Sequence, residues 1–173
     1  MRLLAIDPGP KKSAYCMMRE DFSIISAADV ENEQVLKLVK EGEYDRMAIE
    51  CMQSYGSAVG AETYDTCIWI GRYMQAAIDR EKPITRVYRG EEKQLLIPSK
   101  KNGLPPLPEH AGKTADAQIR AALIARFAKH DKRNGKGTRS NKDVFFGFQG
   151  DMWAAFAVGT VGIVKIRKGM VSA

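Results

Sequence analysis

The sequence has few of the residues that build metal–thiolate sites or disulfide frameworks. Its three cysteines, Cys16, Cys51 and Cys67, are widely spaced and form no C-x-x-C pair, and only two histidines accompany them. This composition excludes a small disulfide-bonded scaffold and disfavours a zinc site. We expect reduced thiols that are mostly buried.

Long apolar runs and targeting segments are also lacking. The longest apolar stretch, Met152 to Ile166, stops short of the ~20 residues that a membrane span needs, and Lys165 and Arg167 close it. The N-terminus, MRLLAIDPG, has neither the long apolar region nor the small-residue cleavage site of a signal peptide. The sequence therefore predicts a cytoplasmic protein with no membrane partner.

Motifs that bind nucleotides are missing as well. The string AGKT at Ala111 to Thr114 resembles part of a phosphate-binding loop, but that loop needs a glycine five residues before its Gly-Lys pair, and Leu107 stands there. The sequence contains no dinucleotide fingerprint and no Gly-x-Ser-x-Gly elbow. We expect no nucleotide cofactor.

Positive charge is present and is concentrated in one segment. The 173 residues are 45% apolar and 28% charged, which fits a single globular domain over residues 1–173 with a net charge of +6. Residues 129–142 hold one acid, Asp131, and six basic residues, a local net charge of +5: Lys129, Lys132, Arg133, Lys136, Arg139 and Lys142. This segment fits a polyanion partner or a solvated loop without a partner, and charge alone favours neither.

Hydrophobic periodicity predicts one mixed α/β unit with a five-stranded sheet. The segments that predict strands are Arg2–Asp7, Ser13–Met18, Phe22–Ala28, Arg46–Cys51 and Ile84–Tyr88. The segments that predict helices are Val35–Val39, about Ser57–Arg80, Lys113–Lys129 and a buried helix starting near Asp151, and Arg89–Leu96 is expected to form no more than a helical turn. The first three strands form an antiparallel meander, and a helical crossover then favours parallel pairing of Arg46–Cys51 with the first strand.

Three carboxylates occupy positions that predict a cation site. Asp7 and Glu50 each end an expected strand, and Asp151 opens the last helix. If the two strands are parallel neighbours, their carboxylates meet at one edge of the sheet and repel each other unless protonated or bridged by a cation. Three such groups suit Mg²⁺ or Mn²⁺. Each has a plainer explanation, namely a turn at Asp7, an exposed strand end at Glu50 and a helix cap at Asp151.

At this point the chain resembles the RuvC-type Holliday junction resolvases, a family with an RNase H-like fold. The opening AIDPGPKKSAYC resembles the family's first strand, where a catalytic Asp precedes Pro-Gly, and Glu50 in MAIECMQSYG matches its second acid. The blocks ETYDTCIWIGRY, ADAQIRAALIARF and FFGFQGDMWAAFAVG are similar to the phage and prophage branch. The resemblance implies a bacterial cell or a phage-infected host.

The resemblance implies metal-dependent cleavage of four-way DNA junctions, with Asp7, Glu50 and Asp151 holding two Mg²⁺ and Mn²⁺ able to substitute. A second ligand, one helical turn after the first in the family, is Ala154 here, so Asp116 and Asp143 are considered as replacements. A lysine of the family's penultimate helix has no clear counterpart, and Lys113 is the nearest substitute.

DNA contacts and a homodimer are implied too. Tyr55 lies where the family reaches into the junction centre, and it either stacks on a base or covers the sheet end. The basic segment is expected to contact phosphates beside the active site through Lys132, Arg133, Lys136, Arg139 and Lys142. The helix carrying Ile68, Trp69, Ile70 and Tyr73 is expected either to form the dimer interface or to pack in the core.

Three other functions stay open. One is a nuclease on the same fold that cuts flaps, forks or structured RNA. Another is a catalytically silent junction-binding or packaging protein, which Ala154 supports. An actin-like ATPase relative is disfavoured by length and by the missing phosphate loops.

Overall fold

A computed structural model of the chain describes residues 1–53, 56 and 60–170. The strands are β1 (Arg2–Asp7), β2 (Lys12–Arg19), β3 (Ile24–Glu31), β4 (Arg46–Cys51) and β5 (Ile84–Tyr88). The helices are α1 (Asn32–Glu41), α2 (Ala61–Ile78), α3 (Arg89–Leu96), α4 (Ala115–Phe127) and α5 (Met152–Arg167). The boundaries differ from the expected ones by a few residues, as at β3, which begins after Phe22 and runs on to Glu31, and Arg89–Leu96 forms a helix where only a helical turn was expected.

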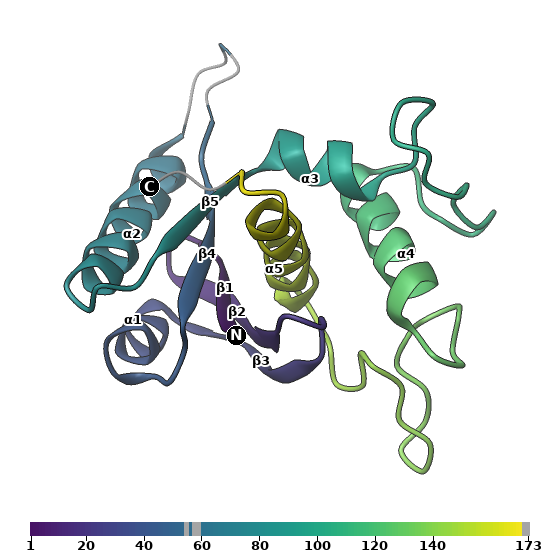
Figure 1. Cartoon of the computed structure of the whole chain (residues 1–173), viewed down its shortest axis with the longest axis horizontal. Helices are drawn as coiled ribbons and strands as arrows, with labels where there is room; N and C mark the ends of the chain where they lie inside the picture. Colours follow the sequence, from purple (N-terminus) through teal and green to yellow (C-terminus); the bar gives the residue numbers. More distant parts are fainter. Residues whose placement is uncertain (54–55, 57–59, 171–173) are drawn as a thin grey trace. The chain divides into compact units, whose positions relative to one another are not determined.

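The strands form one sheet in the order β3-β2-β1-β4-β5. The pairs β1–β2 and β2–β3 are antiparallel, whereas β1–β4 and β4–β5 are parallel. This confirms the predicted meander followed by parallel strands in an RNase H-like sheet, because the crossovers through α1 and α2 return the chain in the same direction. Figure 1 shows the five strands with α1 and α2 on one face and α5 on the other.

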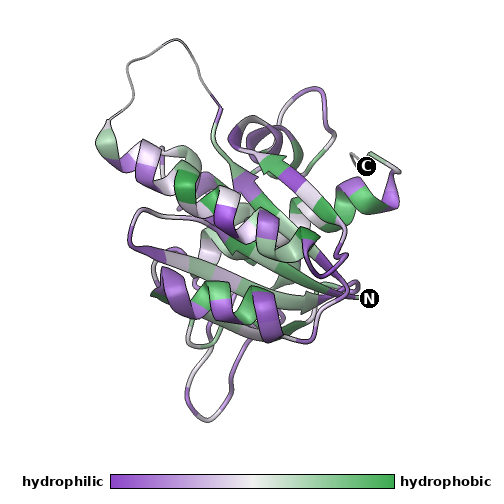
Figure 2. Ribbon diagram, turned by 90° about the vertical axis from the view of Figure 1, so that its left-hand side faces the viewer, coloured by the Kyte–Doolittle hydropathy of each residue, from purple (hydrophilic) through white to green (hydrophobic). Residues whose placement is uncertain are grey.

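The face beneath α1 and α2 carries the larger apolar core. Side chains alternate along each strand, so every second residue of β1 and β4 points to this face. The buried cluster there joins both strands to both helices and includes Leu4, Ile6, Val35, Val39, Tyr44, Met47, Ile49, Ile70 and Tyr73. Figure 2 shows apolar and polar residues alternating along α1 and α2, as expected for helices with one buried side.

The opposite face is covered by α5, which lies close to the sheet. A Cβ atom at Gly162 would lie 2.8 Å from Cβ of Ala48, and one at Gly159 would lie 3.0 Å from Cβ of Ala5. The two glycines therefore allow the helix backbone to approach β1 and β4 directly. Most residues of α5 are buried, as the nearly all-apolar sequence predicts.

The chain divides into two compact units. The sheet unit consists of Met1–Arg89 and Gly150–Ala173, and the inserted unit consists of Gly90–Gln149. In the inserted unit, the proline-containing loop before α4 and the side of α4 enclose an apolar cavity of about 240 Å³. Among the described residues, no helix is both long and apolar enough to cross a bilayer.

The three cysteines are free thiols, but they are less buried than expected. Cys16 is buried, and burial raises its pKa to about 12. Cys51 is half-buried, whereas Cys67 is exposed on α2. The expectation of mostly buried thiols is therefore right for Cys16 only. Helical spacing puts Cys67 in line with Ile70, but the structure exposes Cys67 and buries Ile70.

Candidate functional site

Asp7 and Glu50 end neighbouring parallel strands. The β1–β4 pairing reaches Ile6 opposite Ile49, so Asp7 and Glu50 are the next pair in register. Ile6 and Ile49 point into the core beneath α1 and α2, and alternation directs the following residues to the α5 face. Adjacent strands lie about 4.8 Å apart, so the two carboxylates share one edge of the sheet, as the sequence predicted.

A further carboxylate, Asp29, lies in the same row and was missed from the sequence. Asp7 pairs with Ala14, and Ala14 pairs with Asp29 on β3, which places Asp29 on the α5 face two strands from Asp7. Its Oδ2 atom lies 3.4 Å from the position that a Cβ at Gly150 would occupy. Only the register across two antiparallel pairs reveals this placement, and a sequence does not give that register.

Asp151 stands immediately before α5 and is exposed. Its backbone adopts the right-handed helical conformation, and its side chain makes no capping hydrogen bond. The plain explanation of Asp151 as a helix cap is therefore not supported, and its carboxylate stays available at the start of the helix. Ala154, one turn later, supplies no ligand atom.

A buried polar network holds the turn that follows Asp7. The Gly9 amide donates to Ser13 Oγ at 3.2 Å, and Asn32 Nδ2 donates to the Gly9 carbonyl at 3.0 Å. Ser13 Oγ donates to Asn32 Oδ1 at 2.6 Å and lies 3.1 Å from Tyr73 Oη, which also bonds the Asn32 carbonyl at 3.2 Å. Burial raises the pKa of Tyr73 to about 12, so this hydroxyl stays protonated at neutral pH. The network fixes the backbone on which Asp7 sits.

The acidic edge formed by Asp7 and Glu50 has the donor atoms that a divalent cation requires. Carboxylate oxygens are the ligands that Mg²⁺ takes, and Mg²⁺ commonly uses one or two carboxylates together with waters and substrate phosphates. The Asp7–Glu50 pair meets that requirement. Within residues 1–53, 56 and 60–170, no three His, Cys, Asp or Glu side chains lie close enough together to hold a metal ion. The donors that the edge offers are therefore the two carboxylates of Asp7 and Glu50.

The basic segment folds around Asp143 in the inserted unit. The Asp143 side chain is 0% exposed and accepts backbone N–H bonds from Lys129, His130, Asp131 and Val144 at 2.7–2.9 Å. Burial alone would raise the pKa of Asp143, but these four donors outweigh it and hold the pKa well below its ordinary value. The hydrogen bonds account for Asp143 without a metal ion, so it is not the replacement ligand considered from the sequence.

Asp131 organises the other half of the same segment. Its carboxylate accepts backbone N–H bonds from Arg133, Asn134, Lys136 and Gly137 at 3.0–3.3 Å. These bonds lower the pKa of Asp131. Gly137 then pairs with Lys142 in an antiparallel bridge. The segment is therefore a hydrogen-bonded hairpin loop rather than a loosely solvated one.

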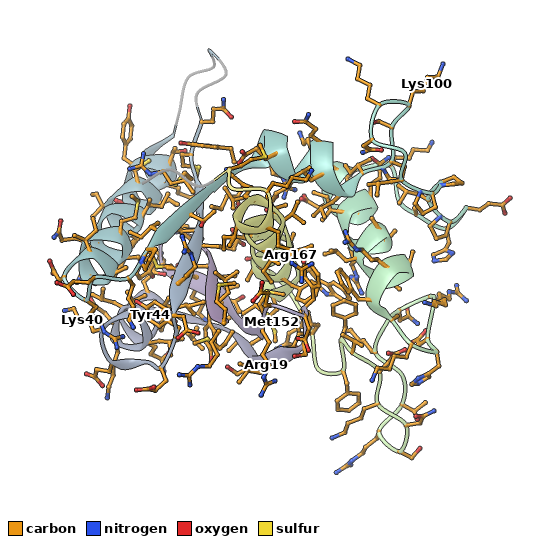
Figure 3. The ribbon with its side chains drawn as sticks, viewed as in Figure 1. Arg19, Lys40, Tyr44, Lys100, Met152 and Arg167 are labelled. Atoms are coloured by element: carbon orange, nitrogen blue, oxygen red, sulfur yellow. The ribbon has the colours of Figure 1, made fainter. Side chains whose placement is uncertain are left out.

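The basic side chains of this hairpin loop differ in their surroundings. Arg133, Arg139 and Lys142 are exposed, and Figure 3 shows nitrogen-tipped side chains spreading away from the loop that follows α4. Lys136 is half-buried. Lys132 donates from Nζ to the carbonyls of Ala125 and Ala128 at the end of α4. Arg133, Arg139 and Lys142 are thus the cations of this loop best placed to meet a polyanion.

Three further residues were expected at the site from the sequence, namely Lys113, Asp116 and Tyr55. Lys113 is exposed just before Thr114, which caps α4 by accepting from the Ala117 amide at 3.3 Å. Asp116 follows in the first turn of α4. Tyr55 lies outside the described residues.

The helix considered for a dimer interface faces two ways. Ile70 and Tyr73 are buried in the core beneath α2, so they cannot form a surface. Ile68 and Tyr64 are 61% and 62% exposed one turn apart. Trp69 is half-buried under Arg72, whose guanidinium lies 4.1 Å from the ring centroid. The core explanation is therefore right for Ile70 and Tyr73.

The sequence matches no family model and no curated protein. Two solved structures are similar in fold. T. thermophilus RuvC in complex with Holliday junction substrate matches with a TM-score of 0.66 at 13% identity, covering 99% of this chain and 98% of that one. The chain has the RuvC fold. The Thermus thermophilus RuvC structure matches with a TM-score of 0.62 at 15% identity, covering 99% of both chains.

The RuvC match covers both units of the chain, including the inserted unit. At this level of identity the match establishes the architecture, and the chemistry depends on this chain's own residues. The carboxylates on the β1–β4 edge and before α5 are the groups from which such a chemistry can be proposed.

Proposed function

We propose that the chain is a metal-dependent endonuclease that resolves four-way DNA junctions by paired nicks. The observation that carries the proposal is the juxtaposition of Asp7 and Glu50 on adjacent parallel strands of a RuvC-like sheet. Two carboxylates at this spacing repel each other, and a bound cation relieves the repulsion.

Asp7 and Glu50 would hold the metal, and Asp151 at the start of α5 would supply the third carboxylate, with two ions in the complete site. When bound, Mg²⁺, or Mn²⁺ in its place, supplies a water of lowered pKa and offsets the charge of the phosphate. The contribution of the chain is to fix the carboxylates. The Ser13–Asn32–Tyr73 network holds the turn after Asp7, and the glycines of α5 hold that helix against β1 and β4.

DNA binding would fall to the basic residues and to Tyr55. The hairpin loop at 129–142 presents Arg133, Arg139 and Lys142 to phosphates, and Lys132, Lys136 and Lys113 add positive charge near them. We propose that residues 1–173 act as one nuclease domain and that two copies form a homodimer, because symmetric nicking of a junction needs two active sites.

A second candidate is a junction-binding protein without catalysis. It is favoured by the alanine at position 154 and by the lack of a preassembled three-ligand group among residues 1–53, 56 and 60–170. Such a protein would retain the fold and the basic hairpin loop but would not need a cation.

A cleavage assay separates these candidates. A labelled four-way junction, a fork and a linear duplex are incubated with the chain in Mg²⁺, in Mn²⁺ and in EDTA, with Asp7→Asn and Glu50→Gln as controls. Symmetric nicks on the junction alone, dependent on metal and absent in both variants, are the expected result. Equal cutting of fork and junction would indicate a general branched-DNA nuclease, and tight junction binding without cutting would indicate the silent binder.

A further inference from the structure

Phe146 is an exposed aromatic side chain four residues after Lys142, the last cation of the basic hairpin loop in the inserted unit. Its exposure is 41%, and it is the one large hydrophobic residue of Gly90–Gln149 that the structure shows exposed. Its neighbours behave differently: Phe145 and Phe148 are 0% and 3% exposed, and their rings meet edge to face with centroids 5.3 Å apart. Two buried rings thus anchor the FFGF segment, while the ring between them faces solvent.

The backbone around Phe146 is fixed. The Phe146 amide donates to the Asp143 carbonyl at 3.0 Å, and the Phe148 amide donates to the Phe145 carbonyl at 3.0 Å. Gly147 adopts a φ of 86°, a backbone conformation that favours glycine. The backbone that carries the Phe146 ring is therefore held in place, and the 41% exposure of the side chain leaves part of the ring open to solvent.

Phe146 also lies beside positive charge. The Nζ atom of Lys142 is 4.8 Å from the centroid of its ring, and Lys142 closes the hairpin loop by its bridge to Gly137. Single-stranded nucleic acids are bound where aromatic rings stack on bases and cations track the phosphates. An isolated exposed apolar side chain is ordinary, but an exposed ring in contact with a cation of the basic hairpin loop is the combination found at such a site.

We propose that Phe146 and the hairpin loop form a contact for unpaired nucleotides of DNA. The ring stacks on a base, and Lys142 and Arg139 bind the flanking phosphates. This inference rests on the DNA binding that the proposed function assumes. It lies within the inserted unit and does not involve the acidic edge. It gives the chain a means of preferring branched or open DNA to continuous duplex, since only unpaired bases expose a face for stacking.

The test measures DNA affinity in EDTA, where no cleavage occurs, with a single-stranded dT oligonucleotide and a linear duplex. Phe146→Ala is expected to weaken single-strand binding roughly 5- to 150-fold, which corresponds to the loss of one base–aromatic stack, and to leave duplex affinity unchanged. Phe146→Trp restores binding because it keeps a ring, whereas Phe146→Leu does not. The matched control is Ile25→Ala, since Ile25 has the same 41% exposure in the sheet unit.

Three results would overturn the proposal: unchanged single-strand affinity in Phe146→Ala, an equal loss on duplex, or full rescue by leucine. The junction-cleavage assay is read separately. If the parent chain cuts no DNA but Phe146→Ala selectively weakens single-strand binding, the proposed nuclease is refuted and the Phe146 contact is retained. A parent that binds neither DNA would refute both.

Discussion

Replacing Asp143 by asparagine sets two physical effects against each other. In the native chain, Oδ1 accepts from the amides of Lys129 and Val144, and Oδ2 accepts from those of His130 and Asp131. Asparagine keeps one oxygen and replaces the other with an amide nitrogen that can only donate. Two backbone N–H groups at a fully buried site therefore lose their acceptor.

Each buried donor left without a partner costs about 1–3 kcal/mol, so the loss of two acceptors in Asp143→Asn is expected to destabilise the chain by roughly 2–6 kcal/mol. That is a large part of the 5–15 kcal/mol of an ordinary domain. The same substitution removes one negative charge from a strongly basic segment, which by electrostatics alone strengthens DNA binding. We expect the loss of loop order to outweigh the charge effect, so that duplex affinity falls.

The assay combines urea unfolding with DNA-binding titrations at several salt concentrations. The matched control is Glu109→Gln, which removes the same charge at an exposed position of the inserted unit. The control should keep the stability of the parent and bind DNA as tightly or more tightly. If Asp143→Asn were as stable as the parent, or bound DNA more tightly, the scaffold role derived for Asp143 would be refuted.

The pH dependence of stability provides a second readout for Asp143. Its pKa is lower in the folded chain than its ordinary value of 3.8, so the unfolded chain binds the proton first as pH falls. The stability that Asp143 contributes is fully present above that ordinary value and is lost as pH falls from about 4 toward the folded pKa. Asp143→Asn should remove this acid-limb loss, which unfolding curves between pH 7 and pH 3 would detect.

Three further predictions concern the acidic edge, the hairpin loop and the buried network. Asp7→Asn should bind a four-way junction in EDTA as tightly as the parent or more tightly, because one negative charge near the phosphates is removed; weaker binding in an anisotropy titration would contradict this. Neutralising the three exposed cations Arg133, Arg139 and Lys142 should lower the slope of log K against log salt by roughly 3 and weaken the binding of all DNA forms alike. A loss of affinity confined to junctions would argue against contact with phosphates alone. Tyr73→Phe should cost about 1–2 kcal/mol in urea unfolding, because its hydroxyl bonds are lost while the ring stays buried, and an unchanged midpoint would remove the network from the argument.

Much of the sheet could be predicted from the sequence because its strands are short apolar runs bounded by turns. The helical crossover between Arg2–Asp7 and Arg46–Cys51 predicts that the two strands pair in parallel, and this pairing places Asp7 beside Glu50. The observed register confirms that the two acids follow the last paired residues. The placement of Asp7 beside Glu50 depends only on the order and direction of the strands, which the hydrophobic periodicity of the sequence predicts.

The rest depended on information that periodicity does not contain. Asp29 reaches the acidic edge through the register of two antiparallel pairs. Asp143 was considered as a metal ligand because it is an acid near the last helix, but its partners are backbone amides spread over residues 129–144, and a sequence does not show them. Ile70 and Tyr73 follow the same helical spacing whether they face a core or a dimer partner, so only the packing separates the two roles.

The close approach of α5 to the sheet has a consequence for changes to this chain. A methyl group at Gly162 would already meet Cβ of Ala48 at 2.8 Å, so any larger residue there must lift the helix. Lifting α5 also moves Asp151, which stands at its first turn. Substitutions that raise heat stability by filling a gap between a helix and a sheet are therefore not available at this contact. Any heat stability gained by enlarging Gly159 or Gly162 would therefore come with a displaced Asp151 carboxylate.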